Sequence, residues 1–322
     1  MQKDYLEFEK SVVDAETKLA DLVDKNEDNP TKSLQRQIGR AEKKLSSVME
    51  KTYGSLTPWQ RVQLARHPKR PFMLDYAELA FDEFIEIHGD RHIGDDEAMP
   101  CGFAKLGEIR VALIGHQKGR ETKENLRRNF GSAHPEGYRK ALRVMRMAEK
   151  FNLPVVTLID TPGAFPGVGA EKRNIAESIA FNLREMTGLK TPIVAVVIGE
   201  GGSGGALGIG VADRVLMLEN AYYSVISPEG CAAILWKDRS KAAEASEALK
   251  LSADNLRKLG IIDGVIAEPG GGAHRDPHAT AAALRRSLFR HLRELSGKDH
   301  ETLLEERYQK FRAMGEFDEV VA

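Results

Sequence analysis

The stretch IVAVVIGEGGSGGALGIGVADRVLMLE, residues 193–219, decides how the middle of this chain is interpreted. It opens with an apolar run and continues, over residues 199–205, with five glycines in seven positions. A continuous apolar run is typical of a strand that is buried on both faces of a sheet. Glycines directly after the run let the backbone turn sharply or approach a ligand closely. The stretch therefore predicts a buried strand, a glycine turn and a short helix over about residues 206–212.

A second apolar run, PVVTLID at residues 154–160, ends in the segment DTPGAFPG at residues 160–167. Helical patterns follow both runs, so the middle of the chain alternates strand and helix as α/β folds do. Open α/β folds bind ligands beyond the carboxyl ends of their strands. We call residues 160–167 the Pro-Gly loop and residues 199–205 the glycine loop. Because they follow successive strands, we expect them to line one site.

The first 50 residues have a different character, being charged and amphipathic with helical periodicity. The break at Asn29-Pro30 predicts a hairpin of two helices. An apolar stripe on a helix needs a cover, so we interpret the hairpin as a subunit contact rather than as a solvated appendage.

Between the hairpin and the central strands, the sequence predicts two helices and a β-hairpin. Thr57 and Pro58 fit the cap and the first position of one helix. The β-hairpin is expected to turn near residues 107–108, and a polar, basic loop to follow over residues 119–137. The other helix is predicted from an apolar stripe at helical spacing, formed by Leu74, Ala77, Phe81, Phe84 and Ile85.

Composition bounds the function. The chain has 322 residues and a formal net charge of −1, which argues against a general nucleic-acid or membrane-surface binder. Two cysteines, Cys101 and Cys231, stand outside any metal-ligand pattern and suggest a reducing compartment. The first residues lack an apolar signal region, and the apolar runs are too short for a membrane span. We therefore expect a cytoplasmic α/β protein.

Metal and phosphate sites are weakly indicated. His88, Asp90 and His92 match no standard metal spacing, so no metal is expected on this chain. Asp160-Thr-Pro-Gly163 resembles a GTPase switch segment, but the chain contains no phosphate-binding P-loop motif.

The glycine loop permits three further interpretations. Residues 199–204 fit a dinucleotide fingerprint with Glu219 at the expected distance, although the following helix is short for that fold. Residues 201–205 fit a nucleophile elbow, with Ser203 as the attacking group. Its partners would be Asp213 or Asp263 and His274 or His278.

The third interpretation uses only the backbone. Gly204 and Gly205 begin a helix, where the first N–H groups have no internal partner. Such donors stabilise an oxyanion, and the absence of side chains lets the oxyanion come close. The pattern alone leaves these interpretations poorly separated.

Longer stretches carry a resemblance to a known family. IDTPGAFPGVGAEKRNIAESIAFNL, VIGEGGSGGALGIGVADRVLMLENAYYSVISPEGCAAILWKD and LGIIDGVIAEPGGGAHRDP resemble the α subunits of bacterial acetyl-CoA carboxylase carboxyltransferase. FDEFIEIHGDR, GHQKGRETKENLRRNFG and the N-terminal hairpin extend the similarity over nearly the whole chain.

The resemblance implies a crotonase-type α/β fold, a spiral of ββα units with an N-terminal helical hairpin. It divides the chain into a hairpin for subunit contact (1–50), a carboxyltransferase domain (51–296) and a C-terminal helical extension (297–322).

The implied reaction transfers the carboxyl group of carboxybiotin to acetyl-CoA, giving malonyl-CoA for fatty-acid synthesis. Biotin would arrive on a separate biotin carboxyl carrier protein that an ATP-using biotin carboxylase has charged. The implied assembly is α2β2, with acetyl-CoA held mainly by the β subunit, which also carries zinc. The α chain alone is then expected to be inactive.

The resemblance also implies roles for residues. Gly204 and Gly205 would hold the negative charge that develops on the biotin ureido oxygen, and no side-chain base is required. Lys118 and Arg120 are weaker candidates for attracting anionic groups. The residues expected to shape the biotin side of the site are Asp160, Gly163, Phe165, Gly201, Gly202 and Ser203.

Alternatives remain open. One is a carboxyltransferase or decarboxylase acting on another acyl-CoA. The others are a serine hydrolase that uses Ser203 and a non-catalytic scaffold.

Overall fold

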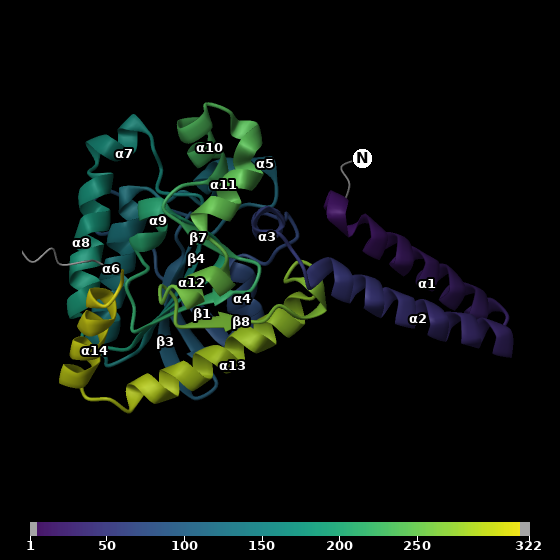
Figure 1. Cartoon of the computed structure of the whole chain (residues 1–322). Helices are drawn as coiled ribbons and strands as arrows, with labels where there is room; N and C mark the ends of the chain where they lie inside the picture. The colour runs from purple at the N-terminus through teal and green to yellow at the C-terminus, as the bar shows by residue number, and fades with distance from the viewer. Residues whose placement is uncertain (1–4, 316–322) are drawn as a thin grey trace, which may run out of the picture.

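A computed structural model describes residues 5–315 of the chain and shows one mixed β-sheet with helices around it (Figure 1). The strand order in the described part is β1-β2-β3-β4-β5-β6-β8, and β7 pairs with the far end of β5. β1, β2 and β3 are antiparallel neighbours, whereas the pairs from β3 onward are parallel. The strands are β1 (Glu83–Glu86), β2 (Cys101–Leu106), β3 (Ile109–Gly115), β4 (Val155–Thr161), β5 (Ile193–Gly202), β6 (Arg214–Leu218), β7 (Tyr222–Ser224) and β8 (Gly264–Ile266).

Helices cover both faces of this sheet and form the N-terminal hairpin (Figure 1). The helices up to the middle of the chain are α1 (Lys10–Asp28), α2 (Lys32–Tyr53), α3 (Pro58–Ala65), α4 (Met73–Ala80), α5 (Thr122–Arg127), α6 (Pro135–Lys150), α7 (Val168–Lys172) and α8 (Ile175–Gly188). The later helices are α9 (Ser203–Leu207), α10 (Pro228–Trp236), α11 (Ala242–Leu249), α12 (Ala253–Lys258), α13 (Pro277–Ser296) and α14 (His300–Arg312). None of the helices in residues 5–315 is long and apolar enough to cross a membrane.

The two central strands are β4 and β5, as their apolar runs predict. Every residue of both strands is buried. In a strand that is covered on both faces, every side chain is buried, so apolar and polar residues do not alternate and the sequence is continuously apolar. The predicted hairpin of α1 and α2, the Thr57-capped helix α3 and the β2–β3 hairpin are also confirmed.

Three local predictions were wrong. Phe84 and Ile85 do not continue a helix but lie in β1, because the backbone becomes extended at Phe81 and pairs with β2. The polar loop at 119–137 contains the short helix α5 and a 3-10 turn at Asn129–Gly131. The helix after the glycine loop covers residues 203–207 instead of 206–212.

The shorter extent of α9 has a packing cause at Gly208. A Cβ atom on that residue would lie 2.5 Å from the Tyr138 ring, so the chain crosses this buried ring at close range. Gly210 adds a second flexible position, and a helix rich in glycine has little intrinsic stability.

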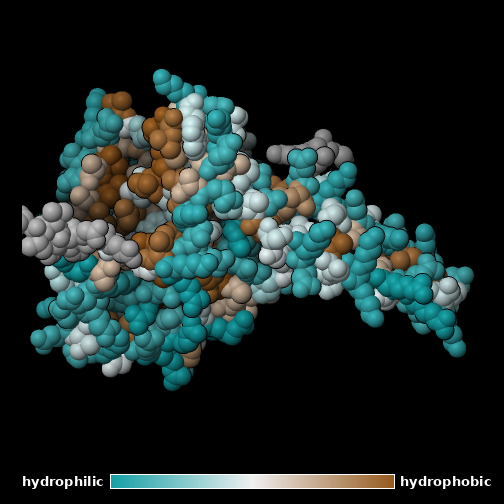
Figure 2. Space-filling view, viewed as in Figure 1, coloured by the Kyte–Doolittle hydropathy of each residue, from teal (hydrophilic) through white to brown (hydrophobic). Residues whose placement is uncertain are grey.

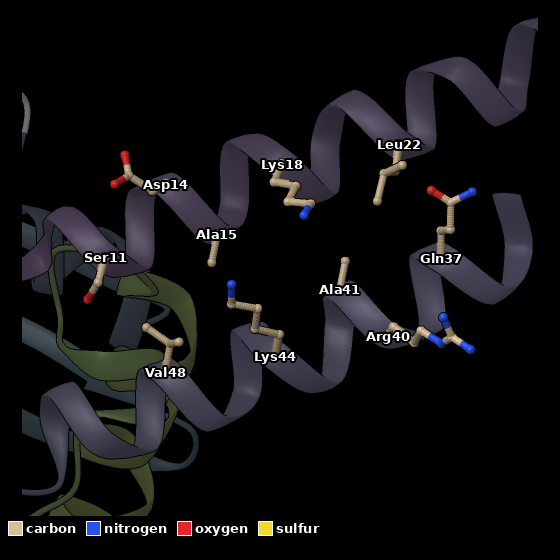
Figure 3. A pocket seen from close by; sticks show the side chains of 10 residues that line it. All are labelled: Ser11, Asp14, Ala15, Lys18, Leu22, Gln37, Arg40, Ala41, Lys44 and Val48. Atoms are coloured by element: carbon tan, nitrogen blue, oxygen red, sulfur yellow. The ribbon is translucent and has the colours of Figure 1, made fainter.

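The N-terminal hairpin projects away from the body (Figure 1). Figure 3 shows that Ala15 and Leu22 of α1 and Ala41 and Val48 of α2 point into the space between the two helices, where Lys18 and Lys44 also reach. The division of the chain at residues 50 and 296 and the role of the hairpin as a subunit contact stay predictions.

Among the buried ion pairs of the described residues, two join distant segments of the body. Arg70 and Glu268 are fully buried and joined by two hydrogen bonds of 2.8 and 2.6 Å. Arg70 also donates to the carbonyl of Ile198, which fixes β5 just before the glycine loop. Arg307 of α14 pairs with Asp213 and ties the last helix to the start of β6.

Candidate active site

The Pro-Gly loop and the glycine loop lie against each other at the carboxyl ends of β4 and β5. The strands are parallel neighbours, and a shift in register brings Thr161 opposite Gly201. A Cβ atom on Gly202 would lie 2.2 Å from the carbonyl oxygen of Pro162. Only glycine permits this approach, so the glycines at these positions are required for joining the two loops.

Gly204 and Gly205 present unpaired N–H groups at this edge. They are the second and third residues of α9, and the cap residue Gly202 supplies no side-chain acceptor. The first N–H groups of any helix lack an acceptor within the helix. Among the turn, loop and cap hydrogen bonds of residues 5–315, neither N–H group donates to a backbone acceptor. Two neighbouring donors are thus available to an oxygen atom from outside.

The surroundings of these two glycines differ. A Cβ atom on Gly205 would lie 2.4 Å from the backbone nitrogen of Ala164, so its space is filled by the Pro-Gly loop. A Cβ atom on Gly204 would meet only Ile179, at 3.8 Å. Gly205 is therefore held by the fold, whereas the side of Gly204 without a side chain is open to a ligand.

A buried charge cluster fixes the strand ends beneath the loops. Lys118 Nζ lies 2.5 Å from Asp160 Oδ1 and 2.9 Å from Glu200 Oε1. The backbone N–H of Glu200 also donates to Asp160 Oδ1 at 2.9 Å. Asp160 Oδ2 is buried without a partner among the described residues. Lys118 thus joins the first residue of the Pro-Gly loop to the second residue of the glycine loop.

Glu200 has a second set of partners on its other oxygen. Its Oε2 accepts hydrogen bonds from Arg66 Nε at 2.7 Å and from the Tyr222 hydroxyl at 2.6 Å. Arg66 also donates a hydrogen bond from Nη1 to Glu229 at the start of α10. Burial opposes ionisation of Glu200, but Lys118 and Arg66 outweigh it and lower its pKa from 4.5 to about 2.

This lowered pKa predicts a pH-dependent stability. The folded-state pKa of Glu200 is about 2, below its ordinary value of 4.5, so its stabilising contribution is complete above pH 4.5 and disappears as the pH falls through 2. The shift corresponds to roughly 3 kcal/mol. Urea unfolding should therefore show a deficit in Glu200→Gln near pH 7 that shrinks between pH 5 and pH 2. A deficit that is constant over this range would contradict the pairing.

The remaining residues expected on the biotin side take different positions. Gly163, with φ of +154°, and the buried Gly201 form the backbone of the two loops. Phe165 is half-buried, and its ring lies 4.2 Å from the ring of His134. Arg120 does not enter the site but pairs with Asp75 and the carbonyl oxygens of residues 68 and 70.

The hydrolase partners of Ser203 are not assembled. Asp213 pairs with Arg307 at the start of β6, about 20 Å along the parallel strands from the first residue of the glycine loop. Asp263 is bonded to Lys310, and His274 to Glu9. His278 is exposed on α13.

The other alternative interpretations lose their structural basis as well. For the dinucleotide interpretation, the Glu219 carboxylate already accepts a hydrogen bond from the backbone N–H of Glu268. The five-residue α9 is also too short to be the helix of a dinucleotide site. Asp90 accepts from the backbone N–H groups of residues 92–94 and from Arg139, so it orders a loop. Asp160 is committed to Lys118.

Sequence reasoning missed Arg66, Tyr222 and the role of Glu200. The available sequence signal for Glu200 is that it is the one acidic residue among the glycines of the glycine loop. Arg66 lies 134 residues away and carries no local signal.

Comparison with known proteins gives a consistent result. A family model described as acetyl co-enzyme A carboxylase carboxyltransferase-like matches residues 5–315. The chain is 55% identical over 314 residues to the acetyl-coenzyme A carboxylase carboxyl transferase subunit alpha of Geobacter metallireducens, covering 98% of both chains. It is 53% identical to the same subunit of Azotobacter vinelandii, covering 98% of this chain and 99% of the relative.

Solved structures show a similar fold at low sequence identity. Transcarboxylase 12S with methylmalonyl-coenzyme A has a TM-score of 0.58 at 20% identity, over 72% of this chain and 43% of that one. A Pseudomonas malonate decarboxylase hetero-tetramer with coenzyme A has a TM-score of 0.59 at 14% identity, over 73% and 91%. The expected crotonase-type α/β fold is confirmed.

Proposed function

This chain belongs to the family of acetyl-CoA carboxylase carboxyltransferase α subunits, and from that premise we propose that it transfers a carboxyl group from carboxybiotin to acetyl-CoA. The product is malonyl-CoA, which supplies fatty-acid synthesis. The single observation that carries the proposal is the pair of unpaired N–H groups at Gly204 and Gly205, beside an open space, in a chain of this family.

The residues at the glycine loop fit the ureido group of biotin. Carboxybiotin, when bound, would supply the activated carboxyl group. Gly204 and Gly205 would hold its ureido oxygen and stabilise negative charge there, and each such donor in an oxyanion hole lowers the activation free energy by about 3–4 kcal/mol. Lys118 and Glu200 hold the two loops in register, so the donors are fixed before the charge develops.

An apolar surface surrounds the glycine loop. Figure 2 shows hydrophobic side chains around a hollow on the face where α7, α9 and α10 lie in Figure 1. Exposed apolar patches on soluble proteins mark interaction sites. We propose that this surface receives the β subunit of an α2β2 assembly and the biotin carboxyl carrier protein, which biotin carboxylase charges. Its exposed residues are Val168, Leu207, Val225, Ile234, Leu235 and Trp236.

If the active site is shared between this chain and the β subunit, carboxyl transfer requires both chains, and this requirement tests the proposed function. We expect no malonyl-CoA from acetyl-CoA and carboxylated carrier protein with the purified chain alone, and rapid formation when the β subunit is added. Robust activity of the chain alone would contradict the shared site. Absence of transfer in the complete mixture would overturn the proposed substrate or reaction, and propionyl-CoA in parallel assays tests another acyl-CoA.

A substitution at Ser203 separates this function from hydrolysis. Ser203 has φ of +51°, a left-handed conformation that glycine adopts freely. Ser203→Gly is expected to retain most of the transfer rate and to leave stability unchanged or raised by up to about 1 kcal/mol. Loss of a nucleophilic serine would instead reduce the rate by about 10⁶-fold. Steady-state assays of the reconstituted enzyme, with thermal unfolding as the fold control, distinguish the two.

A further inference from the structure

The N-terminal hairpin meets the body at a buried junction that the catalytic proposal does not use. Glu9, directly before α1, is only 1% exposed. Its Oε1 accepts from the Tyr53 hydroxyl at 2.7 Å and lies 2.8 Å from His274 Nε2. The ring of His67 lies against that of His274, with centroids 4.3 Å apart. Segments far apart in the sequence thus bring one carboxylate and two imidazoles together.

These three side chains are close enough to share one ion. One potential ligand atom from each of Glu9, His67 and His274 lies within 4.8 Å of the others. Zinc bonds of about 2.0–2.2 Å in a tetrahedral site place the ligand atoms roughly 3.4 Å apart, so the three side chains must close around the ion. His274 faces Glu9 with Nε2, whereas its Nδ1 is buried without a partner in the described part of the chain.

A divalent cation would bind Glu9 as an ionised carboxylate and His67 and His274 as neutral imidazoles. Filling the site therefore releases any proton that these ligand atoms carry, and the Zn²⁺ affinity should fall as the pH is lowered.

We propose that Glu9, His67 and His274 bind one divalent cation of the zinc class, which fastens the N-terminal hairpin to the body. Two imidazoles and one carboxylate bind zinc in known proteins with a water in the fourth position, a ligand set that is typical of catalytic rather than structural sites. The adjoining cavity has a volume of about 310 Å³, ample for that water. The site revises the expectation of no metal, which rested on cysteines and on sequence spacing.

The role assigned to the ion is structural. Figure 1 shows α9 well apart from the place where the hairpin joins the body. The ion must compete with the contact between His274 Nε2 and Glu9 Oε1, which lie 2.8 Å apart. It must also tolerate the positive charge of Arg275, which is paired with Glu16. Both costs place the affinity below that of a zinc finger.

The test is a titration of the purified full-length chain after removal of metal with a chelator. Calorimetry with Zn²⁺ should saturate at one equivalent, and bound Co²⁺ should give the visible absorption of a tetrahedral site. His274→Ala and His67→Ala should each weaken Zn²⁺ binding by about 100-fold or more, because loss of even a supporting residue costs 10–100-fold. His278→Ala removes an exposed histidine of α13 and should bind as the wild type does.

A second measurement tests whether the ion holds the N-terminal hairpin on the body. Zn²⁺ should raise the melting temperature of the wild type and slow amide exchange in the first turn of α1, next to Glu9. Neither effect is expected in Glu9→Gln, which removes a charged ligand with little change in shape. Unchanged Zn²⁺ affinity in His274→Ala and Glu9→Gln, with both variants folded by circular dichroism, would overturn the site. So would a wild type that binds no more Zn²⁺ than these variants.

Discussion

Replacing Gly204 by valine is expected to lower carboxyl transfer by about 10²–10³-fold in the assembled enzyme, the cost of one lost oxyanion-hole donor. The side chain would occupy the open space beside the N–H group and keep the ureido oxygen out of hydrogen-bonding distance. Protein atoms near that space are few, since a Cβ atom on Gly204 meets only Ile179, at 3.8 and 3.9 Å. The effect should therefore fall on the rate and not on folding.

Three further variants isolate that effect. Gly204→Ala adds the smallest side chain and should lower the rate less than valine does, without loss of stability. Gly188→Ala, at a position where a Cβ atom meets nothing within 4 Å, should leave the rate unchanged. Gly205→Ala should destabilise the chain, because its Cβ atom would lie 2.5 Å from the backbone of Gly163. A folded, assembled Gly204→Val enzyme with the wild-type rate would contradict the assigned role.

Lys118→Met is expected to destabilise the chain by about 3–5 kcal/mol near neutral pH. The cation lies between Asp160 and Glu200, whose side chains are 1% and 9% exposed. Burial lowers the pKa of Lys118, but the two carboxylates outweigh that effect and raise it, so the lysine is charged in the fold. Removal leaves Asp160 as a buried carboxylate without a cation. Chemical denaturation of the wild type and the variant measures the difference.

The control for Lys118→Met is Lys123→Met, which removes an exposed lysine of α5 and should change stability by less than about 0.5 kcal/mol. Adding Asp160→Asn to Lys118→Met should recover part of the loss, since the amide carries no charge to be compensated. If Lys118→Met is as stable as Lys123→Met, the cluster does not hold the two loops together.

The parts of the fold that were predictable from sequence are those in which local pattern and tertiary environment agree. β4 and β5 are buried on both faces, so their apolar runs identify them without knowledge of their neighbours. The placement of both loops at one edge follows from the parallel order of these strands. The hairpin of α1 and α2 is long and periodic, and a proline marks its turn.

The failures arise where contacts distant in sequence decide the outcome. Phe84 and Ile85 fit a helical stripe, but pairing with β2 makes them part of a strand. The end of α9 depends on the Tyr138 ring beneath Gly208, some 70 residues earlier in the chain. The glycine donors were identified through family resemblance, whereas Arg66 required the structure, because no local pattern joins it to Glu200.

The most direct test of the central claim is an experimental structure of the α–β assembly with biotinylated carrier protein or free biotin bound. The account predicts the ureido oxygen at about 2.7–3.1 Å from the backbone nitrogens of both Gly204 and Gly205. It also predicts that the Lys118 contacts to Asp160 and Glu200 remain intact. A ureido oxygen bound to side chains elsewhere, with both glycine N–H groups facing water or the β subunit, would contradict it.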